Sequence, residues 1–133
     1  MTLQYRTLGR NGLRVSPLTL GTMMFGGETD EATSRRIIDK AFSQGFNFID
    51  TADGYANYQS EVVVGNAIRE KRDSWVLATK FASPRGDDPN NQGASRKYIR
   101  RAVEGSLKRL GTDYIDIYYL HREDHETSVA ETI

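Results

Sequence analysis

The sequence has no cysteine, no hydrophobic run long enough to cross a membrane and no excess of charge of either sign. Without cysteine, the chain cannot form a disulfide, a thiolate metal site or a cysteine nucleophile. No stretch approaches the roughly 18 consecutive apolar residues of a membrane span, and the first residues lack the apolar segment of a signal peptide. We therefore expect a soluble, cytoplasmic protein that contacts no membrane.

The charges balance, with 18 Lys and Arg against 18 Asp and Glu in 133 residues, so that the formal net charge is zero. A strongly basic surface is the usual sequence sign of a nucleic-acid partner, and its absence leads us to expect no such partner. The length fits one domain, because single domains commonly have about 100–200 residues.

The first residues indicate a β-hairpin. Residues 5–8 and 13–15 flank Arg10-Asn11-Gly12, and Asn-Gly favours a tight turn because both residues tolerate positive φ. The rest of the chain alternates between short apolar segments and segments with a helical period. The predicted strands are 18–20, 46–49, 75–79 and 115–120; the predicted helices follow Asp30, Ser60 and Ser95 as N-caps, Gly45 and Gly111 end the first and third, and a last helix begins near Thr127.

Strands that alternate with helices predict an α/β fold with a parallel sheet and right-handed crossovers. Residues 75–79 are almost continuously apolar, which is typical of a strand buried on both faces. Residues 81–94 form the one long irregular segment. Loops of that length are more often functional than idle, and the alternative is a merely solvated loop.

Polar side chains follow the predicted strands at a single edge. In parallel α/β folds, the carboxyl ends of the strands form the edge that carries the active site. Each of these residues also has an ordinary structural interpretation, as a turn cap, a solvated cation or a structural histidine. The residues are Gly21, Thr22 and Met23 after the first strand, Asp50 and then Tyr55 after the second, Lys80 after the third and His121 after the fourth.

Together these groups suit proton transfer to a carbonyl compound. A free phenol is too weak an acid for neutral pH, but a neighbouring ammonium favours the phenolate. Lys80 can supply that ammonium to Tyr55, and Asp50 can balance its charge. His121 can hydrogen-bond a carbonyl oxygen or share the proton with Tyr55. Such a cluster protonates a developing alkoxide, so a hydride-donating cofactor is needed beside it.

The segment from Gly45 to Tyr55 (GFNFIDTADGY), continued by Ser60-Glu61 and Gly65, resembles the first signature of the aldo-keto reductase superfamily. Other blocks are similar to that family's blocks in the same order, and the resemblance covers essentially the whole chain. These blocks are Leu20-Gly21-Thr22-Met23, Ala78-Thr79-Lys80-Phe81, residues 106–111 (SLKRLG) with Tyr114-Ile115-Asp116, and Leu120-His121.

The resemblance implies a (β/α)8 TIM barrel whose bottom is closed by the N-terminal hairpin. It implies a small-molecule carbonyl substrate and reduction by NADPH, bound without a Rossmann domain. In that family's pattern Tyr55 is the general acid–base, Lys80 and Asp50 tune it, and His121 orients the substrate carbonyl.

The same resemblance assigns the cofactor positions. Gly21, Thr22 and Met23, together with Asp50, match residues that touch the nicotinamide half of NADP(H). Ala56 departs from the family, where many members have glycine after the tyrosine, and this bears on the shape of the loop. The 81–94 loop followed by Ser95-Arg96 resembles the bacterial and plant branch.

Other site types find little support. Residues 21–27 (GTMMFGG) contain neither Gly-x-Gly-x-x-Gly nor the Lys-Ser/Thr of a P-loop. His121 and His125 are spaced like helical zinc ligands, but HREDH is not His-Glu-x-x-His, and we expect no metal site. Asp116 comes early in its strand, where polar residues usually serve stability.

A closed barrel takes about 250 residues, so 133 residues with four barrel strands match its N-terminal half. We interpret residues 1–133 as a partial barrel that ends within its fourth helix, without the late phosphate-binding loops, and expect self-association through its open sheet edges. Two hypotheses follow. The first is an NADPH-dependent carbonyl reductase; the second is a catalytically silent half-barrel, either a fragment or a regulatory or interaction subunit that needs a partner chain. The related redox-barrel subunits of potassium channels are a precedent for a regulatory role, but nothing in this sequence points to a channel partner.

Overall fold

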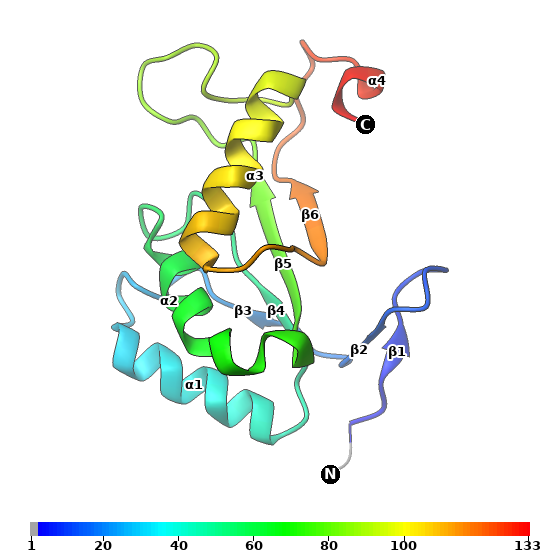
Figure 1. Ribbon diagram of the computed structural model, residues 1–133, viewed down its shortest axis with the longest axis vertical. Coiled ribbons are helices and arrows are strands. Elements are labelled where there is room, and N and C mark those ends of the chain that lie inside the picture. Colours follow the sequence, from blue (N-terminus) through cyan, green and yellow to red (C-terminus); the bar gives the residue numbers. More distant parts are fainter. Residues whose placement is uncertain (1–2) are drawn as a thin grey trace.

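A hairpin precedes a four-stranded parallel sheet in the computed structural model, which describes residues 3–133 (Figure 1). The strands of the sheet lie in the order β3-β4-β5-β6, so each β-α unit places its strand next to the previous one. The hairpin strands are β1 (Arg6–Thr7) and β2 (Arg14–Val15), and the sheet strands are β3 (Leu20–Gly21), β4 (Phe48–Asp50), β5 (Val76–Phe81) and β6 (Ile117–Leu120). The helices are α1 (Glu31–Ser43), α2 (Gln59–Ile68) with the 3-10 segment η1 (Arg69–Ser74), α3 (Arg96–Leu110) and α4 (Val129–Thr132).

The predicted alternation of strands and helices is confirmed, as are two of the three predicted N-caps. Asp30 accepts a hydrogen bond from the Thr33 backbone N–H at the start of α1, and Ser95 accepts one from Tyr98 at the start of α3. Gly111 ends α3 in the left-handed conformation that favours glycine. The expectation that Ser60 caps the second helix is wrong, because α2 begins one residue earlier and its N-cap residue makes no side-chain cap.

The fourth barrel strand begins later than predicted. Residues 115–120 have a strand pattern, but β6 starts at Ile117. The carboxylate of Asp116 accepts hydrogen bonds from the Leu77 backbone N–H and from Arg72, both at 2.8 Å. The Asp116 carboxylate therefore accepts the Leu77 N–H in place of a backbone carbonyl of the neighbouring strand. As its early position in the strand suggested, Asp116 stabilises the beginning of the sheet.

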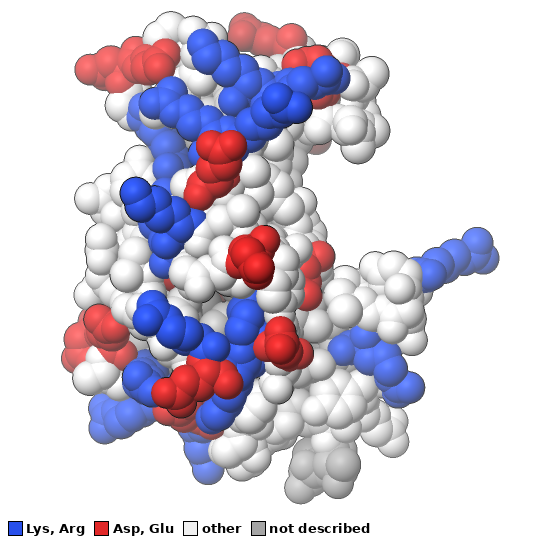
Figure 2. Space-filling view, in the orientation of Figure 1, with Lys and Arg blue, Asp and Glu red and all other residues white. Residues whose placement is uncertain are grey.

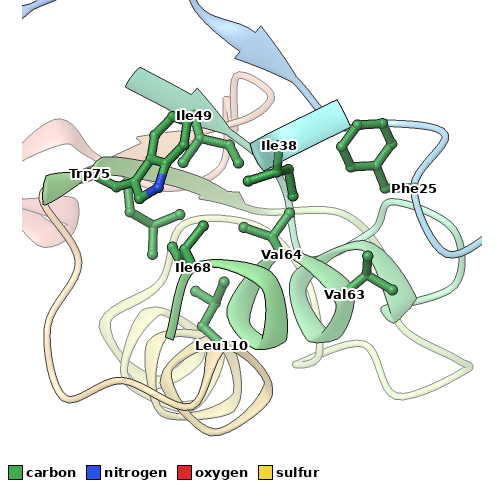
Figure 3. Close-up of a cluster of buried hydrophobic side chains, with 9 residues drawn as sticks. Phe25, Ile38, Ile49, Val63, Val64, Ile68, Trp75 and Leu110 are labelled. Carbon is green, nitrogen blue, oxygen red and sulfur yellow. The ribbon is translucent and has the colours of Figure 1, made fainter. Parts of the chain in front are cut away.

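The main apolar core lies between the sheet and the helices α1 and α2 (Figure 3). Ile49 and Leu77 of the sheet meet Ile38 of α1 and Val64 of α2, and all four are at most 1% exposed. Gly65 lets α2 cross α3 closely, because a Cβ atom there would overlap the carbonyl group of Leu110. This core holds the strands in register and thereby fixes where their carboxyl ends lie.

The opposite face of the sheet is covered at its lower end by the hairpin. Val15 is buried against Phe48 and Val76, and Ala78 completes this cluster. Asn47 anchors the hairpin, since its side chain accepts from the Ser16 N–H at 2.7 Å and donates to the Arg14 carbonyl at 2.9 Å. The hairpin thus occupies the end of the sheet opposite to the carboxyl ends of the strands, as expected for a barrel bottom.

Charged side chains of both signs are mixed over the face shown in Figure 2, with Lys and Arg gathered over the N-terminal half of α3. No helix in residues 3–133 is long and apolar enough to span a membrane.

Candidate active site

Sheet register brings the predicted site residues to one edge. Gly21 pairs with Asp50, and Lys80 pairs with Tyr119, so His121 follows two residues beyond that pair. The backbone N–H of His121 donates to the Phe81 carbonyl at 2.9 Å, which extends the ladder past the end of β6. The carboxyl ends of four strands therefore present their polar residues on a common rim.

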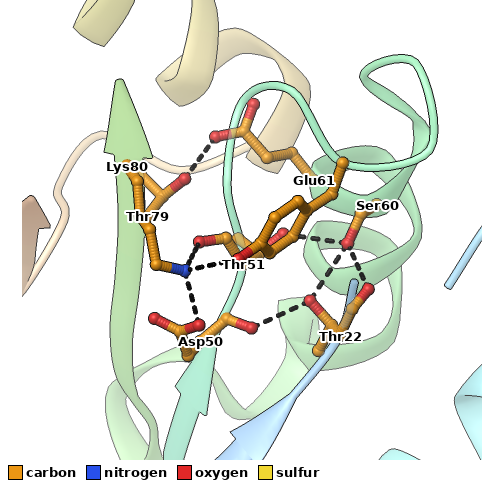
Figure 4. A network of polar contacts seen from close by, with 8 residues as sticks. Thr22, Asp50, Thr51, Ser60, Glu61, Thr79 and Lys80 are labelled. Atoms are coloured by element: carbon orange, nitrogen blue, oxygen red, sulfur yellow. Dashed lines mark hydrogen bonds and ion pairs between the residues drawn. The ribbon is translucent and has the colours of Figure 1, made fainter. Parts of the chain in front are cut away.

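The Lys80 ammonium is held by three oxygen atoms. It donates to Asp50 Oδ2 at 2.5 Å, to the Thr51 carbonyl at 2.9 Å and to the Tyr55 phenol oxygen at 3.1 Å. An ammonium has three N–H donors, so each has a partner. The Lys80 and Asp50 side chains are only 15% and 24% exposed, and Figure 4 shows the ammonium between Asp50 and Thr51. The charge is thereby fixed in position and balanced.

Tyr55 precedes three consecutive non-glycine residues with positive φ. Ala56, Asn57 and Tyr58 have φ of 47°, 50° and 72°. Side chains disfavour this region, and such strain concentrates at functional sites. The left-handed turn reverses the chain between β4 and α2, and the Tyr55 backbone N–H donates to Ala52 within it. The departure of Ala56 from the family's glycine thus falls at a position where glycine is favoured.

His121 stands edge-on to Tyr55. The two ring centroids are 5.7 Å apart at an interplanar angle of 82°. Burial and the nearby Lys80 charge lower the pKa of His121 below its usual value, which favours the neutral ring with one donor and one acceptor nitrogen. Its Nδ1 atom is buried and has no hydrogen-bond partner among residues 3–133.

A chain of hydroxyl groups holds the rim from behind (Figure 4). Ser60 Oγ lies 3.0 Å from Thr22 Oγ1 and 2.9 Å from Thr51 Oγ1, and it donates to the Thr22 carbonyl at 2.8 Å. Thr22 in turn donates its hydroxyl to the Asp50 carbonyl at 2.9 Å. Ser60 therefore does not cap α2 as expected, because its hydroxyl joins α2 to the segments that follow β3 and β4.

Three of the four residues predicted to touch a cofactor, those that follow β3, differ in accessibility. Thr22 is buried and its hydroxyl is engaged with Ser60 and Asp50. Gly21 is exposed, with nothing within 4 Å of where a Cβ would be, and the Met23 side chain is 58% exposed. Gly21 and Met23 are therefore the accessible residues beside Asp50, while Thr22 is buried and hydrogen-bonds the Asp50 carbonyl.

Two buried ion pairs behind the Tyr55 loop were missed by the sequence reasoning. Glu61 is fully buried, 2.6 Å from Arg109 Nε, and it accepts from the Thr79 hydroxyl at 2.6 Å. Asp53 is also fully buried, and its Oδ2 atom lies 2.7 Å from Arg85 Nη2. The angles of this ion pair do not meet those of a hydrogen bond. A signal existed for the first pair, since Glu61 lies on the apolar stripe of α2.

Burial raises the pKa of Asp53 above its ordinary value even with the Arg85 guanidinium beside it. The Arg85 and Arg109 guanidinium groups both lie over the Tyr58 ring, with their central carbons 4.5 and 5.4 Å from its centroid. These contacts join the Tyr55 loop to the loop after β5 and to α3, so they fix the loop that carries the phenol.

A cavity of about 390 Å³ opens beside the site. Tyr55 and His121 line it together with Ser83, Arg85 and Arg122. Its size is within the range of small-molecule sites, roughly 300–1,000 Å³. No group of three or more metal-ligating side chains occurs within residues 3–133.

Comparisons with known proteins agree with this geometry. A model of the Aldo/keto reductase family matches residues 17–133. A probable voltage-gated potassium channel subunit beta from Oryza sativa is 42% identical over 98% of this chain and 41% of its own length. An uncharacterized oxidoreductase from Bacillus subtilis is 45% identical over 94% of this chain and 42% of its own length. The chain therefore spans about two fifths of the length of the curated relatives it matches.

The holo form of an aldo-keto reductase from Bacillus halodurans has a similar structure. It matches 98% of this chain with a TM-score of 0.86 and 41% identity, and the chain covers 44% of it. The predicted fold class, the N-terminal part of a TIM barrel behind a hairpin, is confirmed by this match together with the parallel sheet.

Proposed function

Because this chain belongs to the aldo/keto reductase family, we propose that it carries the proton-transfer site of an NADP(H)-dependent oxidoreductase that reduces an aldehyde or ketone to the alcohol. The observation that carries the proposal is the contact between Lys80 and Tyr55. The ammonium donates to the phenol oxygen, so the proton of the phenol is free for an acceptor in the neighbouring cavity.

In the proposed reaction a substrate carbonyl oxygen lies in the cavity lined by Tyr55 and His121. Tyr55 donates its proton to that oxygen as alkoxide character develops, and His121 donates a second hydrogen bond. The phenolate that remains is stabilised by the Lys80 ammonium, whose charge Asp50 balances. In alcohol oxidation, the same phenolate takes the proton back.

The cofactor supplies the hydride when it is bound. The residues present fit its nicotinamide end, because Gly21 leaves open space beside Asp50 and the Met23 side chain is exposed next to it. Thr22 supports this surface through its hydrogen bond to the Asp50 carbonyl. Gly21, Thr22, Met23 and Asp50 are therefore the residues we propose to hold that end.

A second candidate is a regulatory or interaction subunit that does not turn over substrate. Two plant relatives at 42% and 41% identity are named probable voltage-gated potassium channel subunits beta. The edge strands β3 and β6 each pair on one side only, so the sheet also offers edges for a partner chain or a second copy.

Turnover separates these candidates, and cofactor binding is measured first. Quenching of NADPH fluorescence by residues 1–133 tests that binding directly. For activity, residues 1–133 are joined to the remaining part of the Bacillus halodurans barrel, and aldehyde-dependent loss of NADPH absorbance is followed. Tyr55→Phe should lower kcat by about 10²–10⁴-fold. Tyr114→Phe, which alters a phenol bonded to Asp73 away from the cavity, should leave it unchanged. Wild-type kcat in Tyr55→Phe would refute the acid–base assignment.

A further inference from the structure

The cavity beside Tyr55 is lined by positive charge only. Arg85 and Arg122 line it, and no aspartate or glutamate does. The other lining residues carry no fixed charge: Gly54, Tyr55, Asn57, Tyr58, Ser83, Pro84 and His121. A chain with zero formal net charge thus presents a local excess of positive charge at the proposed substrate site.

The two arginines differ in how far their charges are compensated. Arg85 lies 2.7 Å from the fully buried Asp53, and it also stacks on Tyr58. Arg122 is exposed and forms no ion pair within residues 3–133. Arg122 is therefore the cation of this cavity that no carboxylate within residues 3–133 holds at ion-pair distance, although Glu123, Asp124 and Glu126 line an adjoining cavity with it.

The effect of Arg122 reaches the catalytic rim. After burial and Lys80, its charge is among the contributions that lower the pKa of His121. Arg122 lines the same cavity as Tyr55 and His121, so a substrate whose carbonyl oxygen lies between those two rings shares the cavity with the guanidinium. A planar guanidinium forms paired, charge-assisted hydrogen bonds with carboxylate and phosphate groups.

We propose that this cavity selects carbonyl substrates that carry an oxyanion, a carboxylate or a phosphate monoester, and that Arg122 is the specificity-determining residue. The proposal rests on the proposed function and names the substrate class of the same site. A cationic substrate is disfavoured because like charges would be placed together in the cavity.

Binding to the chain itself tests the proposal without turnover. Three aldehydes of similar shape are titrated into residues 1–133 labelled with 15N: 4-carboxybenzaldehyde, 4-formylphenyl phosphate and the neutral methyl 4-formylbenzoate. We expect at least one anionic aldehyde to bind about tenfold more tightly than the ester, with shifts of the Arg122 Nε–H signal. The carboxylate and phosphate arms show which oxyanion is preferred.

Two variants separate a specific contact from general attraction. Arg122→Gln should remove the preference for the anion and leave binding of the ester unchanged. Arg100→Gln, which removes an exposed arginine of α3 outside the cavity, should keep the preference. Equal affinities for acid, phosphate and ester, or a preference that survives in Arg122→Gln, would overturn the proposal.

Failure of the oxyanion proposal can be told apart from failure of the proposed reductase function. In the completed barrel, selective binding of the anions without any NADPH oxidation would contradict the reductase and keep the oxyanion site. Reduction of all three aldehydes with equal kcat/KM would keep the reductase and reject the oxyanion site.

Discussion

Lys80 and Tyr55 are joined by a hydrogen bond in which the ammonium donates to the phenol oxygen at 3.1 Å. The residues come from different β-α units, and their contact depends on the register between β4 and β5. Asp50 and Thr51 accept hydrogen bonds from the other two N–H groups of the ammonium. The sheet itself therefore fixes the position of the positive charge beside the phenol. The site is therefore preorganised by the strands.

This arrangement predicts strong coupling between Lys80 and Asp50. Lys80→Met leaves the largely buried Asp50 carboxylate without its cation, and should lower the free energy of unfolding by about 1–3 kcal/mol. Adding Asp50→Asn should restore part of the loss, because the unpaired charge is then gone. Urea denaturation of the two single variants and the double variant measures this coupling, and additive losses would contradict it.

Replacing Glu61 should lower the free energy of unfolding far more than breaking an ion pair of an arginine on the surface. Glu61→Ala leaves Arg109 without its buried carboxylate and the Thr79 hydroxyl without its acceptor. We expect a loss of about 3–5 kcal/mol. Arg101→Ala, which breaks the 3.6 Å pair between the exposed Arg101 and Asp88 side chains, should cost less than about 1 kcal/mol. Similar losses for the two variants in thermal or urea unfolding would refute the buried pair's importance.

Ala56→Gly should stabilise the protein. Ala56 has φ of 47°, and this left-handed conformation costs a side-chain-bearing residue about 1–2 kcal/mol. The greater freedom of glycine in the unfolded chain offsets about 0.4–1 kcal/mol, so a net gain of up to about 1 kcal/mol is expected. Ala32→Gly in the exposed first turn of α1 should instead cost about 1 kcal/mol. Urea midpoints that fall for both variants would argue against strain at Ala56.

The lowered pKa of His121 predicts that stability depends on pH in the weakly acidic range. Its pKa in the folded chain lies below the ordinary 6.5, mainly because of burial, so the unfolded chain binds a proton more readily. Stability should therefore fall as pH decreases below about 6.5, until the lower folded pKa is passed. His121→Asn should flatten this part of the profile relative to wild type, whereas His125→Gln, at an 86% exposed side chain, should not. Parallel urea titrations from pH 7.5 to about 5 measure the difference.

Much of the rim could be predicted from sequence. Asp50, Lys80 and His121 each stand at or next to the end of an apolar segment, and parallel strands deliver their carboxyl ends to one edge. The caps at Asp30, Ser95 and Gly111 were equally local, because a helix end is set by residues three or four positions apart. The order of the sheet followed from the alternation of β and α segments.

The failures were of a different kind. Ser60 has the sequence of a cap, but its hydroxyl bonds to Thr22, 38 residues away in the chain. Asp116 has the pattern of a strand residue, but its carboxylate replaces a ladder carbonyl for Leu77. In both cases a short polar side chain hydrogen-bonds a backbone group far away in the chain instead of one within a few residues.

The sequence alone therefore determined the α/β order and the groups that reach the rim, since these depend on the local hydrophobic period and on strand ends. Only the tertiary structure decided how those groups are supported. Glu61 meets Arg109 across 48 residues, Asp53 meets Arg85 from the loop after β5, and the exposed Arg122 lines the cavity beside Tyr55. Burial makes an ion pair necessary, but which cation supplies it depends on the packing of α2, α3 and the sheet, and no local pattern in the chain records that choice.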